Sequence, residues 1–387
     1  MHPLGTNGKV PRDVVARCSC TDEFTPSAAA LINGAPRLLF LPVSGPAGMG
    51  ETVRSMQIAY AALRRWPNAK PHFALSRESP LAADFPFDCT LLPASPTFHS
   101  AEVSQLIAKL QPAVVIFDNS GRTRQLRAAR ATGARIVYIS SRPRQRRKAF
   151  RWRWRQMIDE HWIAYPRFLA GSLSWLERFK LRLQPQSTVR YLDVILPAPT
   201  PQAEARAAQH LGVATAPFAL FVAGGVTNHP HAIDAVGIFA AAAKRCATMG
   251  HRTVLIGAGE RATAADAQLI ALPRLPADEL IALLRRAQVV VTNGGATLLQ
   301  AMACGAACIA VPIAGDQPER IRRCVRAGVA LDAPLAESAM AAQAAELLGS
   351  AAQRAALAES CRQLKLADGL AIAVQGLEFL LRDRGGS

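Results

Sequence analysis

The sequence lacks the patterns by which most metal sites and disulfide frameworks are recognised. Its eight cysteines are scattered, with no Cys-x-x-Cys pair, and Cys18 and Cys20 stand too isolated to form half of a zinc site. No Asp-x-Asp pair occurs, although many enzymes that act on phosphate-linked substrates hold a divalent cation with one. We therefore expect no metal and no cofactor, and a reduced, cytoplasmic chain.

Long apolar runs are also missing. No stretch approaches the roughly 18 residues that a membrane-spanning helix needs. The first thirty-odd residues combine spaced charges with proline, which is not typical of a signal peptide. Apolar residues nevertheless make up 50% of the 387 residues, which is enough for the cores of two ordinary domains. We expect a soluble or peripheral protein.

Acidic residues are few, 28 against 45 lysines and arginines, so the formal net charge is +17. This excess favours an anionic partner such as a phosphate-rich ligand, an anionic membrane or nucleic acid. In residues 142–155, eight cations are interleaved with three aromatic side chains. Nucleic acid is the less favoured partner, because tryptophan concentrates at the membrane interface and cations there attract anionic lipid. The expected membrane contacts are Arg146, Arg147, Phe150, Trp152 and Trp154.

The chain alternates short apolar runs with amphipathic stretches. Residues 1–35, rich in Gly, Pro and Ser, are expected to be a poorly ordered leader. A buried strand at Arg37–Val43 is followed by a glycine loop and an amphipathic helix near residues 52–65. This alternation indicates an α/β fold with a parallel sheet and crossover helices. Further strands are expected at Phe73–Leu75, Thr90–Leu92, Val114–Phe117, Ile136–Ile139 and Val189–Leu196.

A proline-rich stretch at residues 198–202 is the clearest linker in the chain. It separates a first domain, residues 36–197, from a second domain, residues 203–365. The stretch from Leu366 to Arg384 has apolar residues at helical spacing. In the second domain we expect a helix at Ala203–His210, strands at Phe218–Ala223, Thr253–Ile256, Val289–Thr292 and Ala307–Val311, and helices near 232–246 and 276–286.

The most informative stretch runs from Val289 to Gly328. It reads as a buried strand, a Gly-Gly turn, a helix, a second strand, a Gly-Asp-Gln loop and a final helix. The turn Asn293–Gly295 precedes helix amides that are unpaired and carry the positive end of the helix dipole, so it predicts a phosphate cradle. Asp316 and Gln317 follow the second strand, at the sheet edge where open α/β folds bind ligands.

This order of parts resembles the donor site of the glycosyltransferase-B (GT-B) superfamily, especially the enzymes that add N-acetylglucosamine to a lipid-linked cell-wall precursor. The matching residues are Gly294, Gly295, Thr297, Ala301, Gly305, Pro312, Asp316, Gln317 and Gly328. Asn293 stands where the family has a histidine, and Gln300 where an acid binds the ribose hydroxyls. The resemblance implies two Rossmann-like domains facing across a cleft, with a helix in residues 366–387 that crosses back to the first domain.

The resemblance also implies how a nucleotide sugar, by default a UDP-sugar, would be bound. A glycine-rich loop in the second domain would contact the donor diphosphate, and a basic and apolar patch on the first domain would dock on a membrane carrying a lipid acceptor. Gln300 can still donate to and accept from a ribose. The donor-site residues are then Gly224, Gly225, Thr227, Asn228, Asn293, Gly294, Gly295, Thr297, Gln300, Asp316 and Gln317.

The loop after the first strand resembles the first loop of the same families, and its expected phosphate- or acceptor-binding residues are Gly48, Gly50 and Arg54. The family's catalytic histidine is replaced by Glu51, our candidate for the base that deprotonates the attacking hydroxyl. A free glutamate has a pKa of about 4.3, so burial or the neighbouring Asp118 would have to raise it. Asp118 is itself a weaker catalytic candidate, and Glu51 could instead merely cap its helix.

We therefore expect a metal-independent glycosyltransferase that moves a hexosyl or N-acetylhexosaminyl group to a hydroxyl of a membrane-associated or lipid-linked acceptor. Glycine-rich loops at helix N-termini would stabilise the leaving diphosphate. The protein would act on the inner face of the cytoplasmic membrane. Two alternatives remain: a nucleotide-sugar hydrolase or epimerase on the same fold, and a binding protein with a degenerate site, which the replacements at Glu51 and Asn293 would support.

Overall fold

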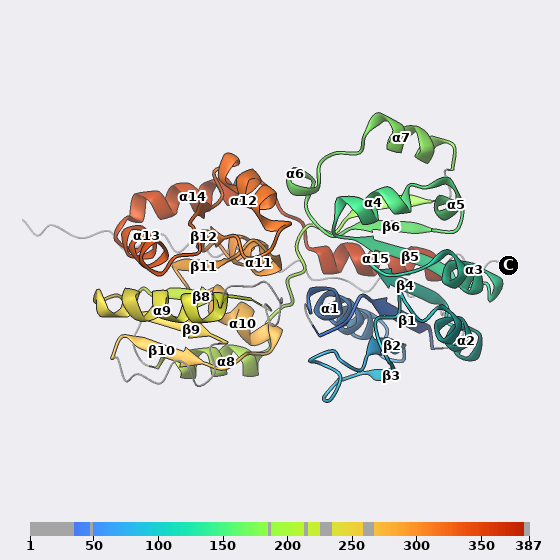
Figure 1. The fold of residues 1–387 in the computed structure, drawn as a ribbon, viewed down its shortest axis with the longest axis horizontal. Helices are drawn as coiled ribbons and strands as arrows, with labels where there is room; N and C mark the ends of the chain where they lie inside the picture. Colours follow the sequence, from blue (N-terminus) through green and yellow to red (C-terminus); the bar gives the residue numbers. More distant parts are fainter. Residues whose placement is uncertain are drawn as a thin grey trace, which may run out of the picture.

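The computed structural model describes residues 35–46, 49–184, 187–212, 216–224, 234–257 and 267–382. Within them, two parallel sheets lie side by side, one formed by residues 37–191 and one by residues 219–332 (Figure 1). Each sheet has a buried hydrophobic cluster on both of its faces, because helices cover both. The expected α/β class with two Rossmann-like domains is confirmed.

The first sheet has seven strands in the order β3-β2-β1-β4-β5-β6-β7. Its central strands are almost entirely apolar because each lies between two helix layers. The strands are β1 Arg37–Pro42, β2 Lys70–Ser76, β3 Asp88–Leu92, β4 Val114–Asp118, β5 Arg135–Ser140, β6 Glu160–Ile163 and β7 Thr188–Tyr191. The helices are α1 Gly50–Arg65, α2 Ser100–Leu110, α3 Thr123–Ala131, α4 Pro143–Ala149, α5 Trp152–Arg155, α6 Arg167–Ala170 and α7 Trp175–Arg182.

Strand β6 was not predicted, because two of its four residues are Glu160 and His161. All four are buried, and the polar ones have partners. Arg190 Nη2 lies 3.0 Å from Glu160 Oε1, and Ser140 Oγ lies 2.8 Å from His161 Nε2. Burial, reinforced by two nearby arginines, lowers the pKa of His161 to about 3, so the ring is neutral at pH 7.

The second sheet has six strands in the order β10-β9-β8-β11-β12-β13. They are β8 Ala219–Val222, β9 Thr253–Ile256, β10 Leu269–Leu272, β11 Val289–Asn293, β12 Ala307–Val311 and β13 Leu331–Asp332. The helices are α8 Pro201–Leu211, α9 Ala235–Thr248, α10 Ala277–Leu284, α11 Ala296–Ala303, α12 Gln317–Arg326, α13 Glu337–Gly349 and α14 Ala351–Gln363. Helix α8 begins inside the predicted linker, because Thr200 caps it and proline is favoured in a first helical turn.

Helix α15, Gly369–Arg382, leaves the second domain and packs on the first, as predicted (Figure 1). Its buried face, including Leu370 and Leu377, belongs to the same hydrophobic cluster as β1, β4 and β5. Arg65 on α1 forms an ion pair of 2.8 Å with Glu378. The first domain is therefore completed by residues that follow the whole second domain. In the part of the chain that the structure describes, no helix is long and apolar enough to cross a bilayer.

Candidate active site

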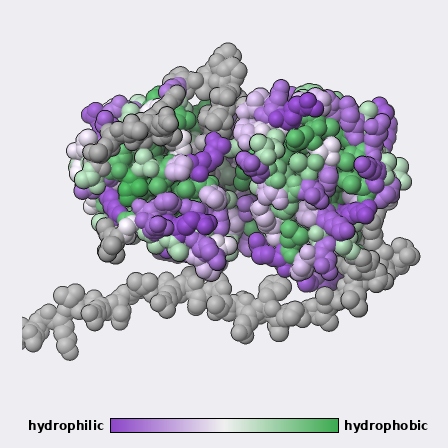
Figure 2. Space-filling view, turned by 90° about the horizontal axis from the view of Figure 1, so that it is seen from below, coloured by the Kyte–Doolittle hydropathy of each residue, from purple (hydrophilic) through white to green (hydrophobic). Residues whose placement is uncertain are grey.

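The carboxyl ends of the two sheets meet where the domains touch. Met49, after β1, lies with its sulfur Sδ 3.3 Å from Nη1 of Arg274, which follows β10. The guanidinium carbon of Arg320 on α12 lies over the ring of Tyr165, which follows β6, at 4.4 Å from the ring centroid. Figure 2 shows the two lobes that meet along this boundary. Because open parallel sheets bind ligands at the carboxyl ends of their strands, this boundary is the candidate active site.

Glu51 lies half-buried in the first turn of α1, on the first-domain side of the boundary. Its Oε1 accepts a hydrogen bond of 2.8 Å from Nδ2 of Asn119. Asn119 follows β4 with a left-handed backbone, φ 54°, and its Oδ1 accepts from the N–H of Ser141 at 2.9 Å. Asn119 thus links the ends of β4 and β5 to Glu51. It was not identified from the sequence, although it follows Asp118 directly.

The structure corrects the role expected for Asp118. The carboxylate is fully buried and accepts from Arg54 Nε at 3.0 Å and Nη2 at 2.5 Å, and from the Ser55 hydroxyl at 3.2 Å. A base must reach a substrate proton, so Asp118 is wrong as a catalytic group and is instead the counter-ion of Arg54. Burial raises the pKa of Asp118 to about 6, against the opposing effect of the guanidinium. Burial alone would lower the pKa of Arg54, but the Asp118 carboxylate raises it.

Of the glycines predicted in the first loop, the structure describes Gly50. Gly50 is the first residue of α1, and a Cβ built there would meet nothing within 4 Å. The phosphate- or acceptor-binding role of this loop stays a prediction. The other predicted loop residues, Gly48, Gly225, Thr227 and Asn228, lie outside the described residues.

The donor turn is held in shape by the buried side chain of Asn293. Its Nδ2 donates to the carbonyl of Ala223 at 2.7 Å, and its Oδ1 accepts from the N–H of Gly295 at 2.7 Å. A Cβ on Gly224 or Gly295 would collide with this amide. Asn293 therefore joins the loops after β8 and β11. Direct contact between Asn293 and a donor stays a prediction.

Three further predicted donor residues, Gln317, Thr297 and Gln300, are buried or half-buried. Gln317 is buried and its Oε1 accepts from the N–H of Ile313 at 2.9 Å, so it shapes the loop after β12. Thr297 is half-buried in the first turn of α11. Gln300 donates through Nε2 to the carbonyl of Ile195 at 2.8 Å, so binding a ribose would require it to leave this bond.

Gly294 and Asp316 lie on either side of a cation, Arg320, that was not identified from the sequence. The Arg320 side chain is 11% exposed and forms an ion pair of 3.1 Å with Asp316. Its Nη1 also donates to the carbonyl of Gly294. Asp316 reaches the first domain as well, with one oxygen 3.8 Å from Nε of Arg142. A positive charge therefore sits beside the glycine turn at the domain boundary. The sequence signal that could have identified Arg320 is its position, one helical turn after Asp316.

The predicted membrane segment, residues 142–155, is partly folded into the domain, with Ala149, Phe150, Trp154 and Arg155 buried. Phe150 and Trp154 are each only 4% exposed, and Trp154 Nε1 donates to Thr123 Oγ1 at 3.1 Å. Trp154 also packs edge-on against Tyr138 of β5. As membrane contacts, Phe150 and Trp154 are wrong, because Trp154 is buried against α3 and β5 and Phe150 against His161 of β6. Arg146 is likewise wrong, because it is engaged by internal hydrogen bonds. Only Trp152 and Arg147 of the five predicted contacts are exposed, and their role stays a prediction.

Solved structures with the same architecture identify the fold. The spinosyn forosaminyltransferase SpnP superposes with a TM-score of 0.63 and 16% identity, over 90% of this chain and 100% of its own. The chain has the GT-B fold. The GT-B fold is shared by Arabidopsis thaliana UGT89C1 complexed with UDP-L-rhamnose, at a TM-score of 0.59 and 13% identity over 90% of this chain and 99% of that one. It is also shared by Acinetobacter baumannii MurG, at a TM-score of 0.53 and 13% identity over 90% of this chain and 99% of that one.

These identities establish the GT-B fold and leave the substrates open. Neither a comparison with protein-family models nor one with curated protein sequences gives a match. Among the described residues, no group of three or more His, Cys, Asp or Glu side chains is arranged to hold a metal ion.

Proposed function

We propose that this chain is a glycosyltransferase that moves a hexosyl or N-acetylhexosaminyl group from a nucleotide-diphosphate donor, UDP-sugar by default. The acceptor is a hydroxyl of a membrane-associated or lipid-linked molecule. The observation that carries the proposal is the nearly buried cation Arg320 beside the Gly294–Gly295 turn at the N-terminus of α11. An anionic diphosphate is the ligand that a helix N-terminus and an adjacent guanidinium favour together.

In the reaction, the acceptor hydroxyl attacks the anomeric carbon of the sugar, and the bond from that carbon to the diphosphate oxygen breaks. Arg320 and the first amides of α11 stabilise the negative charge that develops on the leaving diphosphate. This arrangement supplies positive charge from the chain itself, so the proposed step is metal-independent. Glu51, oriented by Asn119, takes the proton from the hydroxyl.

The donor half of the proposal is tested by thermal unfolding of the purified protein with a panel of nucleoside diphosphates. A ligand that binds the folded state raises the melting temperature by mass action. We expect a shift selective for one nucleotide that is reduced in Arg320→Gln and Asp316→Ala. Arg322→Gln is the matched control, because Arg322 is an exposed arginine of the same helix paired with Glu319. The thermal shift of Gln300→Ala tests separately whether Gln300 contacts the ribose.

The outcomes separate the remaining functions. A wild type that shows no shift with any nucleotide would overturn the transferase proposal. Release of nucleotide from a nucleotide sugar in water, without an acceptor, would favour a hydrolase or epimerase on the same fold. Binding without turnover under any condition would favour the degenerate binding protein.

A further inference from the structure

Helix α7, between β6 and β7, has no buried residue. Trp175, Leu176 and Phe179 of α7 form one exposed stripe with Leu183, the residue that ends the helix: Trp175 is 69% exposed, Leu176 49%, and Phe179 and Leu183 52% each. Figure 1 shows α7 standing off from the body of the first domain, beyond α4 and α5. A surface helix of a globular protein normally buries its apolar stripe. The stripe of α7 is turned away from the rest of the chain.

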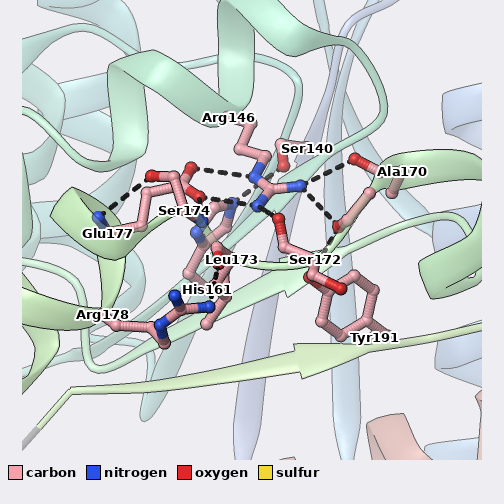
Figure 3. Close-up of polar contacts among 11 residues, drawn as sticks. Ser140, Arg146, His161, Ala170, Ser172, Leu173, Ser174, Glu177, Arg178 and Tyr191 are labelled. Carbon is pink, nitrogen blue, oxygen red and sulfur yellow. Dashed lines mark hydrogen bonds and ion pairs between the residues drawn. The ribbon is translucent and has the colours of Figure 1, made fainter.

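The position of α7 is nevertheless tightly fixed by Arg146, as Figure 3 shows. Arg146 Nε and Nη2 donate to the Glu177 carboxylate of α7 at 2.9 and 2.7 Å. The same guanidinium donates to the carbonyls of Ala170, Gly171 and Ser172, at 2.8, 3.0 and 2.9 Å. A bidentate arginine with additional carbonyl acceptors is a strong and directional anchor.

The first turn of α7 is fixed as well. Ser174 and Glu177 form a capping box, with the Ser174 hydroxyl accepting from the N–H of Glu177. A helix that is held this firmly, yet buries none of its residues against the described chain, indicates a partner outside the chain.

The charges around the stripe are of one sign. Residues 142–184 contain twelve arginines and lysines but only three acids. Each acid is already paired with an arginine: Asp159 with Arg130 and Arg135, Glu160 with Arg190, and Glu177 with Arg146. The exposed cations of this region are therefore free of acidic partners within it. They include the arginines that flank the exposed apolar side chains: Arg178 and Arg182 on α7, and Arg151 and Arg153, the sequence neighbours of Trp152.

Trp152 is 47% exposed, and the segment that carries it is tied to α7, because Lys180 Nζ donates to the carbonyl of Phe150 at 3.1 Å. The combined surface is defined here as the α7 face: Trp152, Trp175, Leu176, Phe179 and Leu183 with the flanking arginines. An aromatic stripe rimmed by cations complements the headgroup region of an anionic bilayer. Two copies of the α7 face would bring arginines against arginines, which disfavours self-association.

We propose that the α7 face docks on an anionic lipid bilayer, with its aromatic side chains at headgroup depth and its arginines on the lipid phosphates. Docking itself depends only on the α7 face. Its use in bringing an acceptor to the domain boundary rests on the proposed function. Lipid contact thus lies mainly on α7, and not on the buried part of residues 142–155.

Flotation of the full-length protein with vesicles tests the proposal. Phosphatidylcholine vesicles containing about one-third phosphatidylglycerol are compared with pure phosphatidylcholine at about 0.1 M salt. We expect wild type to float with the anionic vesicles, and Trp175→Ser/Phe179→Ser to lose about tenfold or more in partitioning. Phe98→Ser is the matched control, because Phe98 is 71% exposed on a loop of the same domain but far from the α7 stripe in sequence.

Three results would overturn the proposal. The first is wild type that stays at the bottom of the gradient with both vesicle types, and the second is a double variant that floats as well as wild type. The third is a double variant whose oligomeric state in gel filtration differs from that of wild type, which would make the α7 face a protein interface. Nucleotide thermal shifts on the same samples keep the two proposals apart: nucleotide binding without flotation rejects only the lipid surface, and flotation without nucleotide binding rejects only the transferase.

Discussion

Single side chains at the domain boundary divide into those that shape the site and those that are open to a substrate. Asn293, Gln317 and Asp118 were all expected to meet a ligand, yet each is buried and satisfied by other parts of the chain. Sequence patterns place such positions at the carboxyl ends of the strands, where a ligand is expected. They do not distinguish a side chain that holds a loop from one that faces the substrate, because both roles demand polar residues beside glycine turns.

The ion pair of Arg54 with Asp118 gives the first prediction. Arg54→Gln leaves a buried carboxylate without its counter-charge, so we expect the free energy of unfolding at pH 8 to fall by about 3 kcal/mol. The folded-state pKa of Asp118, already raised to about 6, would rise further. A carboxyl with a raised folded pKa contributes stability that is lost as pH rises through that pKa. The loss in Arg54→Gln should therefore be smaller at pH 5 than at pH 8.

Urea unfolding at the two pH values measures this difference. Ser55→Ala, which removes one hydrogen bond from the same carboxylate, is the control and should cost about 1 kcal/mol. Equal losses for Arg54→Gln at pH 5 and pH 8 would contradict the buried ion pair.

Glu51 gives the second prediction at this scale. If it is the base, Glu51→Gln should lower kcat by about 10²–10⁴-fold while the nucleotide-induced thermal shift is retained. Asn119→Ala should lower kcat less, because it removes only the hydrogen bond that orients Glu51. Steady-state rates with a nucleotide sugar and an acceptor are the measurement. An unchanged kcat in Glu51→Gln would leave Glu51 as a helix-terminal residue only.

Among the elements, β6 shows how polar residues hide a strand. His161 is neutral in the folded protein because its pKa is lowered to about 3, whereas the unfolded chain takes up a proton below its ordinary pKa of 6.5. Stability linked to His161 is thus present above pH 6.5 and lost as pH falls. We expect wild type to lose about 2 kcal/mol between pH 7 and pH 5 from this group. In urea unfolding, His161→Gln should lose about 2 kcal/mol less than wild type between pH 7 and pH 5. An equal loss in the two proteins would refute the neutral, buried state of His161.

Helix α15 provides a paired test of packing. Leu377 is fully buried against the first sheet, while Phe379 of the same helix is 47% exposed. Leu377→Ala should destabilise the protein by about 2–5 kcal/mol, because it leaves a cavity at the junction of α15 with the sheet. Phe379→Ala should change stability by no more than about 0.5 kcal/mol. Similar losses in both variants, measured by urea unfolding, would mean that α15 does not pack as described.

Regular elements with strong local signals were predictable from the sequence. Strand β12 was predicted with its observed bounds, and α15 and its return to the first domain were expected in outline, because their apolar patterns match the strand and helix periods. The failures share one cause. Phe150 and Trp154 lie among arginines, and nothing local tells whether tertiary packing will bury such aromatics. Helix α7 was not predicted, although Ser174 and Glu177 form a capping box at its start; what the local sequence does not show is that Arg146, about thirty residues earlier, fixes its position.

At the scale of the whole molecule, the net charge of +17 is unevenly spread, and residues 142–184 carry a large share of it. Salt screens such charges, with a Debye length of about 10 Å at 0.1 M and about 3 Å at 1 M. Partitioning of wild type onto anionic vesicles should therefore fall steeply between these concentrations. Arg153→Gln/Arg182→Gln should bind more weakly at low salt and approach wild type at high salt. Salt-independent binding would argue against an electrostatic contribution.

The return of α15 also sets an order of events during synthesis. A ribosome releases residues 37–191 long before residues 369–382, so the first sheet must wait, with part of one face uncovered, until the entire second domain has been made. The second domain, in contrast, has all its strands before α15 begins. We thus expect the second domain to complete its fold first, and the first domain to complete its fold last, when α15 packs on its sheet.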